Sequence, residues 1–210
     1  MAYFPFMVDI SGRQCLVVGG GSIALHKVNI ILEFDANIRV VAEELCPKLR
    51  ETALKNPSIE LQERAFQDED IEGADFVIAA TDREAVNLHI SKLCKTKGIP
   101  INAVDMKEAC SFIFPAILKE KDMVVAVSSG GSSPAAVSYL KDKLRRHIPD
   151  YYGEMIEELA EYRDYICEHI ETAKLRRKIF YELVEYGDGH NGNIPDAMVR
   201  QLVEKYRELS

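Results

Sequence analysis

The order of apolar and polar residues divides the first half of the chain into alternating strands and helices. Short apolar runs predict buried strands, and apolar residues at a spacing near 3.6 predict the helices that follow them. Alternating strands and helices are typical of a doubly wound parallel sheet with right-handed crossovers. The predicted strands are residues 15–18, 38–42, 59–63, 76–80 and 101–104, and the predicted helices are 22–34, 44–55 and 84–96. We therefore expect an α/β fold of the Rossmann type over residues 1–112.

The second half of the chain follows a different pattern. Residues 112–118 and 123–127 predict two strands whose short polar turn makes them antiparallel. Two apolar strands alone form a marginal hairpin, so a second copy of the chain is the simplest surface to cover them. Ser133 and Pro134 predict the start of a helix that ends near His147. We expect a small α+β dimerisation segment over 113–149.

The remaining residues, 150–210, are expected to form a helical C-terminal domain. Residues 151–185 follow a helical pattern, and a last amphipathic helix covers 194–209. The glycine-rich residues 187–193 are predicted to form the turn between them.

Three glycines stand directly between the first strand and the first helix. Gly19, Gly21 and Ala24 occupy the marked positions of the G-x-G-x-x-G/A pattern. The first glycine permits the tight turn, the second lets backbone approach a pyrophosphate, and the small third residue lets helix pack on strand. The free N–H groups at the start of the helix would hold the pyrophosphate. Dinucleotide binding is the predicted role, and a purely structural turn is the alternative.

Glu43 and Glu44 end the second strand, a little over twenty residues after Gly19. An acid at this place can accept hydrogen bonds from the adenosine ribose, and its charge would repel a 2′-phosphate. The cofactor predicted on this ground is NAD rather than NADP. In the alternative interpretation, these two acids simply begin the next helix.

Thr81, Asp82 and Asp105 also follow predicted strands. Ligands of doubly wound sheets bind at the carboxyl ends of the strands, so these residues should meet the glycine turn and Glu43 in one crevice. Asp105 could take a proton from a substrate as hydride leaves for the nicotinamide. It could instead be an ordinary turn or N-cap aspartate.

A serine-glycine loop precedes the helix that begins at Pro134. It could be a simple helix start, or a nest of backbone N–H groups and hydroxyls that holds an anion, and the two interpretations are compatible. Its residues are Ser128, Ser129, Gly130, Gly131 and Ser132.

Composition narrows the possible partners. A net charge of −8 without a basic stripe argues against nucleic acid. No apolar run approaches the roughly 20 residues of a membrane-spanning helix, and the N-terminus does not read as a signal peptide. The five cysteines are scattered, as expected of reduced thiols in a cytoplasmic protein, and no histidine or cysteine spacing suggests a metal site.

Several motifs together resemble the precorrin-2 dehydrogenase family, which includes the N-terminal module of bacterial siroheme synthase. The resemblance covers residues 1 to 150 in order, whereas 150–210 match only in being helical. One departure is His26, which stands where family members commonly have arginine. The segments that carry the resemblance are 17–24 with Lys27, 79–82, 102–105, 109–116 and 125–134.

The resemblance implies NAD-dependent oxidation of precorrin-2, a tetrapyrrole, to sirohydrochlorin on the route to siroheme. It also implies a homodimer, with Asp105 at the family's catalytic aspartate and Ser129 at a serine that some members phosphorylate. The implied NAD contacts are Ser22, Ile23, Glu43 and Glu44. The serine-glycine loop would bind the side arms of the substrate.

Two other functions stay open. Some family members also insert ferrous iron into sirohydrochlorin, for which Asp105 and His147 are candidate residues, although His147 could equally be a helix-end group. A dimer that senses NAD without catalysis would keep the glycine turn and need no Asp105.

Overall fold

The computed structural model describes residues 3–208. The chain divides into two compact units, Met1–Phe114 and Pro115–Ser210.

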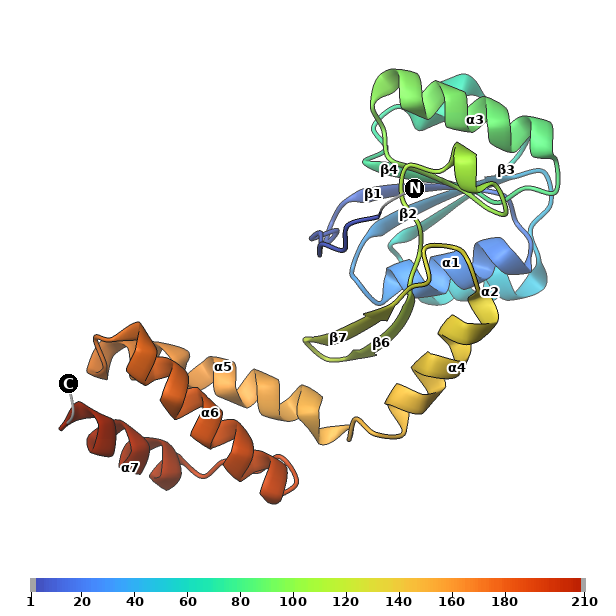
Figure 1. Ribbon diagram of the computed structural model, residues 1–210. Helices are drawn as coiled ribbons and strands as arrows, with labels where there is room; N and C mark the ends of the chain where they lie inside the picture. Colours follow the sequence, from blue (N-terminus) through green and yellow to red (C-terminus); the bar gives the residue numbers. More distant parts are fainter. Residues whose placement is uncertain (1–2, 209–210) are drawn as a thin grey trace. The chain divides into compact units, whose positions relative to one another are not determined.

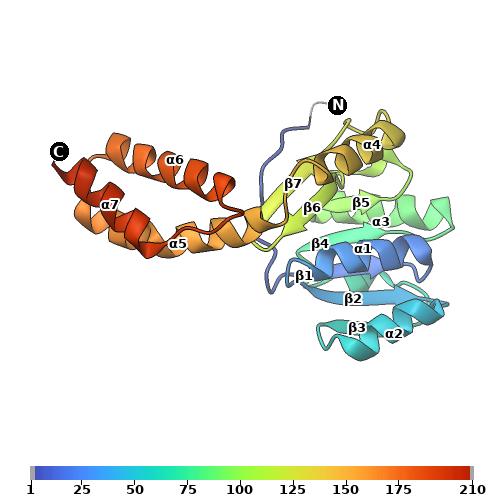
Figure 2. The ribbon, with the colours of Figure 1, turned by 90° about the horizontal axis from the view of Figure 1, so that it is seen from below.

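The first unit is built on one parallel sheet of five strands in the order β3-β2-β1-β4-β5 (Figures 1 and 2). The register pairs Val18 of β1 with Val41 of β2 on one side and with Ala79 of β4 on the other. All five predicted strands are present, which confirms the doubly wound α/β fold. The strands are β1 Gln14–Val18, β2 Asn37–Ala42, β3 Ile59–Glu63, β4 Phe76–Ala79 and β5 Ile101–Ala103.

Helices cover both faces of this sheet (Figure 1). Cys15 and Val17 of β1 pack toward α1 (Ser22–Leu32) and α2 (Pro47–Lys55). Leu16 and Val18 alternate with them and pack toward α3 (Glu84–Lys97) on the other face. Because successive residues of a strand face opposite sides, one apolar run fills two cores. Two short 3-10 turns, η1 (Asp68–Ile71) and η2 (Lys107–Ala109), complete the unit.

Two predicted boundaries of this unit were wrong. The helix expected from residue 44 begins at Pro47, so Glu43 and Glu44 lie in the loop before α2. The strand expected from 112 begins only at Ala116. Phe112 instead packs its ring against Phe76 and Phe114, at centroid distances of 6.4 and 5.6 Å. The aromatic residues before 116 therefore serve the core of the first unit.

The second unit contains a hairpin and four helices. The strands β6 (Ala116–Glu120) and β7 (Met123–Val127) are antiparallel, as predicted, and join through a two-residue turn with Lys121 in the left-handed region (φ 51°). The predicted helical stretch 151–185 is interrupted at residues 170–172, and the second of its helices continues through Gly189. The helices are α4 Pro134–Arg145, α5 Tyr151–His169, α6 Ala173–Gly189 and α7 Asp196–Arg207.

The last three helices share one core. Met155 and Ile166 of α5 pack with Ile179 and Leu183 of α6 and with Leu202 of α7. This confirms the helical C-terminal region. Within residues 3–208, none of the helices is long and apolar enough to cross a membrane.

The fully buried Ile78 in the interior strand β4 provides a test of this core. We expect Ile78→Ala to lower the free energy of unfolding by about 2–5 kcal/mol, because the removed atoms leave a cavity in the sheet core. Urea unfolding measures the change. Leu54→Ala is the matched control, since Leu54 is 88% exposed and its loss should cost no more than about 0.5 kcal/mol. Equal effects of the two substitutions would contradict the described core.

Candidate dinucleotide site

The glycine turn after β1 is closed on two sides by neighbouring backbone. Gly19 has a φ of 126°, and a Cβ added there would collide with the carbonyl oxygen of Ala80 after β4. A Cβ added at Gly20 would collide with the carbonyl oxygen of Glu44 after β2. The Gly19 N–H donates to the Val41 carbonyl (2.9 Å), and the Cys46 N–H donates to the Gly20 carbonyl (2.9 Å). We call Gly19, Gly20 and Gly21 the glycine corner.

The third glycine of the corner faces open space. A Cβ added at Gly21 would meet no atom within 4 Å. Gly21 is also the N-cap of α1, where no side chain caps the helix. The first-turn N–H groups of an α-helix have no partner within the helix, so the N–H groups at Ser22 and Ile23 are available to a ligand. An open corner at an uncapped helix start fits a pyrophosphate.

The residues of the first helix fit this arrangement. Ala24, the small residue at the third marked position, is completely buried in the cluster that contains Cys15 and Val17. Ile23 is 47% exposed although it is a large apolar residue, and Ser22 is exposed as well. These two of the predicted NAD contacts therefore lie at the accessible end of α1.

The two acids after β2 make different contacts: Glu44 through its backbone and Glu43 through its side chain. Glu44 is exposed and approaches the glycine corner through its carbonyl group. The carboxylate of Glu43 forms an ion pair with Arg83, with 2.8 Å between Oε1 and Nη2. Nothing in the residue pattern singled out Arg83, because an exposed arginine at a helix start is ordinary in sequence terms.

Thr81, after β4, uses its side chain to fix its own loop. Its hydroxyl donates to Oδ1 of Asn87 (2.7 Å), and the Asn87 amide donates to the Thr81 carbonyl (3.0 Å). The Thr81 oxygen also accepts from the Arg83 N–H (3.2 Å). Asp82 is exposed in the same loop. Asn87 is a buried polar residue on the apolar face of α3, and that exception to the helix pattern was the signal that could have revealed it.

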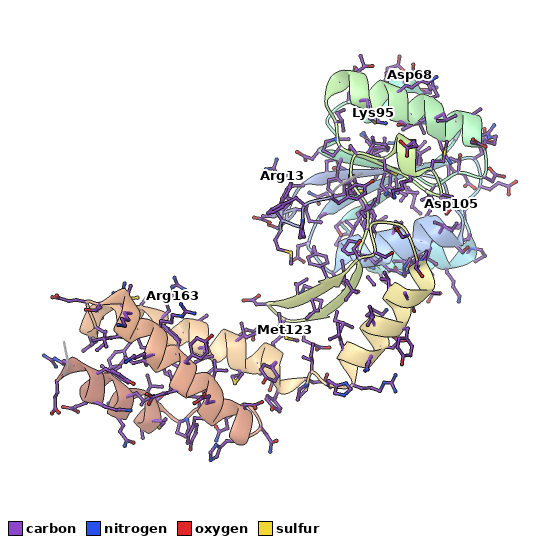
Figure 3. The ribbon with its side chains drawn as sticks, in the orientation of Figure 1. Arg13, Asp68, Lys95, Asp105, Met123 and Arg163 are labelled. Atoms are coloured by element: carbon purple, nitrogen blue, oxygen red, sulfur yellow. The ribbon has the colours of Figure 1, made fainter. Side chains whose placement is uncertain are left out.

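Asp105, after β5, lies in a left-handed turn with φ 61°. It is exposed, and among residues 3–208 no hydrogen bond or ion pair engages its carboxylate. The following turn, η2, has Met106 as its N-cap and lacks a side-chain cap, so Asp105 is not a capping residue. In Figure 3, Asp105 lies at the end of the sheet where the parallel strands finish, opposite to Arg13, which precedes β1.

The loop around Asp105 is held by a buried thiol. Cys110 Sγ accepts from the Ala103 N–H (3.2 Å) and donates to the Ala103 carbonyl (3.1 Å). Burial raises the pKa of this thiol. Cys110 therefore remains a neutral thiol, which can make both hydrogen bonds at once.

Lys27 of α1 is a further charged residue near this end of the sheet. Its Nζ lies 4.0 Å from the centroid of the Phe114 ring, a cation–π contact. Burial lowers the pKa of Lys27, and interaction with Cys110 and with Asp105 acts in the opposite direction. The sequence pattern marked Lys27 only as part of a motif. Its interactions with Phe114 and Asp105 could not be predicted, because these residues lie about 80 positions further along the chain.

The serine-glycine loop lies in the second unit. Gly130 (φ 61°) and Gly131 (φ 83°) are both left-handed. The Ser128 hydroxyl oxygen accepts from the Gly130 N–H (3.1 Å), and the Ser129 oxygen accepts from the Ser133 N–H (2.9 Å). Both hydroxyls keep their hydrogen for a ligand, and Ser132 is exposed beside them.

The structure also accounts for Ser133 and His147. Ser133 caps α4 by accepting from the Ala136 N–H (3.3 Å), as predicted. His147 contacts the Lys143 carbonyl through Nδ1 (2.7 Å), which agrees with a helix-end group. Within the described part of the chain, no three His, Cys, Asp or Glu side chains form a group that could hold a metal ion.

Comparison with known proteins gives a family match and several similar proteins. A family model described as "Putative NAD(P)-binding" matches residues 6–116. The siroheme synthase of Thioalkalivibrio sulfidiphilus is 40% identical over 186 residues, which cover 88% of this chain and 38% of that protein. The siroheme synthase of Pseudomonas paraeruginosa is 38% identical over 188 residues, covering 90% and 40%. The chain thus spans about two fifths of the length of these relatives.

A solved structure has the same fold. SirC, a precorrin-2 dehydrogenase, superposes with a TM-score of 0.73 and covers 99% of this chain and 100% of its own, at 23% identity. The family match confirms the predicted nicotinamide dinucleotide cofactor. The similarity to the two siroheme synthases confirms the predicted family resemblance.

Two glycine substitutions separate the folding role of the corner from its binding role. Gly21→Ala should change the free energy of unfolding by no more than about 1 kcal/mol yet weaken NAD binding about tenfold or more, because its methyl group enters the open corner. Gly19→Ala should lower both stability and affinity, since Ala80 leaves no space for a methyl group. Thermal unfolding and calorimetric titration with NAD measure the two effects. Unchanged NAD affinity in the Gly21 variant would exclude the corner as the binding site.

Proposed function

Because the chain belongs to this family of NAD(P)-binding proteins, we propose that it oxidises precorrin-2 to sirohydrochlorin with NAD. This is a step of siroheme biosynthesis, the process named by its siroheme synthase relatives. The similarity in fold to SirC, a precorrin-2 dehydrogenase, supports the same reaction class.

The observation that carries the proposal is the position of Asp105. An exposed carboxylate that makes no hydrogen bond or ion pair among residues 3–208 follows β5, at the same end of the sheet where the glycine corner follows β1. Ligands of doubly wound sheets bind at that end. An unpaired carboxylate there is free to accept a proton from a bound substrate.

The reaction removes a hydride and a proton from the tetrapyrrole and extends its conjugation. NAD supplies the hydride acceptor when it is bound. In our proposal the open glycine corner and the start of α1 hold the pyrophosphate, and Glu43 and Glu44 lie on the adenosine side. Thr81 and Asp82 lie in the loop after β4, the strand between β1 and β5 in the sheet. Asp105 takes the proton, which then passes to solvent.

Substrate binding needs local donors. Precorrin-2 carries carboxylate side arms, whereas the protein has a net charge of −8, so its overall field does not attract the substrate. We assign recognition of these arms to the serine-glycine loop. Its two successive glycines are left-handed, and the hydroxyls of Ser128 and Ser129 retain their hydrogen as donors. The residues concerned are Ser128, Ser129, Gly130, Gly131 and Ser132.

We also propose that the protein acts as a homodimer through β6, β7 and α4, which lie within the predicted segment 113–149. Leu118 is the one buried residue of the two strands. α4 buries no residue at all, and it exposes Tyr139 and Leu140. A second copy of the same surface would cover these apolar side chains.

Replacement of Asp105 tests the catalytic assignment. We expect Asp105→Asn to lower kcat by about 10²–10⁴-fold, because the amide cannot accept the proton, and to leave the Kd for NAD within about twofold. Formation of sirohydrochlorin and NADH is followed spectroscopically, with NAD affinity measured by calorimetry. Asp35→Asn is the control, since Asp35 is also left-handed (φ 57°) but lies in the loop before β2, at the other edge of the sheet.

The same assay separates the alternatives. Wild-type turnover by the Asp105 variant would refute its role as base. Tight NAD binding by the wild-type protein without turnover of precorrin-2 would favour an NAD sensor. Insertion of ferrous iron into supplied sirohydrochlorin without NAD would show chelatase activity. The protein would then be bifunctional if it also turns over precorrin-2, and a chelatase alone if it does not.

The dimer has its own test in α4. The double variant Tyr139→Glu/Leu140→Glu should sediment as a monomer where the wild-type protein sediments as a dimer, because the new charges would be buried without partners. Tyr181→Glu on α6 is the control, with a similarly exposed tyrosine in the same unit. A double variant that remains dimeric would place the interface elsewhere.

A further inference from the structure

An ion pair joins the two loops that enclose the glycine corner. Glu43 follows β2 and Arg83 follows β4, and β1 lies between these strands in the sheet. The Arg83 Nη2 and the Glu43 Oε1 are 2.8 Å apart. The pair therefore spans the end of β1, which leads into Gly19 and Gly20. A dinucleotide held at the corner would lie close to both side chains.

The pair is exposed and can open at little cost. The side chain of Arg83 is 55% exposed and that of Glu43 is 52% exposed. Solvent-exposed ion pairs contribute little to stability, because water and salt compete with them. Arg83 can thus exchange the Glu43 carboxylate for another anion without disturbing the fold.

The backbone beneath Arg83 is fixed, however. Its N–H donates to the Thr81 hydroxyl oxygen (3.2 Å), and Thr81 is held by the buried Asn87. The backbone of Arg83 is therefore held in place, while its guanidinium is exposed to solvent. Glu43 approaches the guanidinium at Nη2, and a guanidinium has five N–H donors in a planar fork that matches a phosphate.

These two charges have opposite preferences for the ribose of a dinucleotide. A carboxylate in this position accepts hydrogen bonds from the ribose hydroxyls of NAD and repels a 2′-phosphate. An arginine nearby accommodates the 2′-phosphate of NADP. Because Arg83 neutralises Glu43, the expected repulsion of NADP is cancelled where both side chains are present.

We propose that Arg83 is a specificity-determining residue that lets the dinucleotide site accept NADP as well as NAD. Glu43 accepts from the ribose hydroxyls of NAD, and Arg83 leaves Glu43 to bind the 2′-phosphate of NADP. This inference rests on the proposed function in one respect, the binding of a dinucleotide at the glycine corner.

Asp82 makes the effect of removing Arg83 larger. This exposed carboxylate lies next to Arg83 in the chain and acts electrostatically on the guanidinium. Without Arg83, both Glu43 and Asp82 stand unopposed on this side of the corner. A 2′-phosphate should then be strongly disfavoured relative to a free hydroxyl.

Equilibrium binding tests the proposal without any turnover. Calorimetric titrations of the whole 210-residue chain with NAD, NADP, 5′-AMP and 2′,5′-ADP give four dissociation constants, and the last two probes carry no nicotinamide. The wild-type protein should bind NAD and NADP within about tenfold of each other. Arg83→Gln should weaken NADP and 2′,5′-ADP about tenfold or more, through loss of a charge-assisted contact, and change NAD and 5′-AMP less than about threefold.

Two further variants complete the design. Glu43→Gln should strengthen NADP relative to NAD, because the repelling charge is gone while Arg83 remains. Arg13→Gln is the matched control, since Arg13 also forms an exposed ion pair, with Asp75, but precedes β1 at the other edge of the sheet (Figure 3). It should change none of the four constants. Added salt should reduce the effect of Arg83 on NADP.

The outcomes distinguish this inference from the proposed function. If Arg83→Gln weakens all four ligands equally, Arg83 binds a shared phosphate and the inference is wrong. If the wild-type protein binds NAD but discriminates against NADP more than about a hundredfold, and Arg83→Gln leaves that ratio unchanged, the inference is also wrong. If the wild-type protein binds none of the four, the dinucleotide site itself fails, and the proposed function fails with it.

Discussion

The close approach of three loops at Gly19 and Gly20 is the constraint on which the rest of this site depends. Because these residues have no side chains, the carbonyl groups of Ala80 and Glu44 can close on the end of β1 from either side. This contact fixes the loops after β2 and β4 against the glycine corner. It also leaves Gly21 and the start of α1 as the open side, where an anion can reach backbone N–H groups.

Two buried polar side chains hold the surrounding loops. Asn87 fixes the loop after β4 through Thr81, and Cys110 fixes the loop after β5 through Ala103. Buried polar groups are costly unless they are hydrogen bonded, so each of them favours a single loop conformation. As a result, Asp105 keeps its position although its own carboxylate makes no structural hydrogen bond. Proton transfer from a bound substrate requires a base that is held in position and whose carboxylate is available to the substrate.

The sequence predicted the features that depend on local pattern. The strands, the glycine turn, the position of Asp105 after the last strand and the Ser133 cap all followed from short-range spacing. The choice of a catalytic role for Asp105 over that of a turn residue came only from the family resemblance. Contacts between distant segments could not be predicted in this way. The Glu43–Arg83 pair and the cation–π contact of Lys27 with Phe114 depend on the order of strands in the sheet. The start of β6 was missed because Phe112 and Phe114 fit a strand pattern, whereas in the structure Phe112 packs against the rings of Phe76 and Phe114.

The central claim is that a dinucleotide binds at the open side of the glycine corner, next to Asp105. Titration of ¹⁵N-labelled protein with NAD, followed by amide chemical shifts, tests it most directly. The account predicts the largest shifts at Gly21, Ser22 and Ile23, with further shifts at Arg83 and Asp105. Shifts confined to the other edge of the sheet, around Arg13 and Asp35, would contradict it.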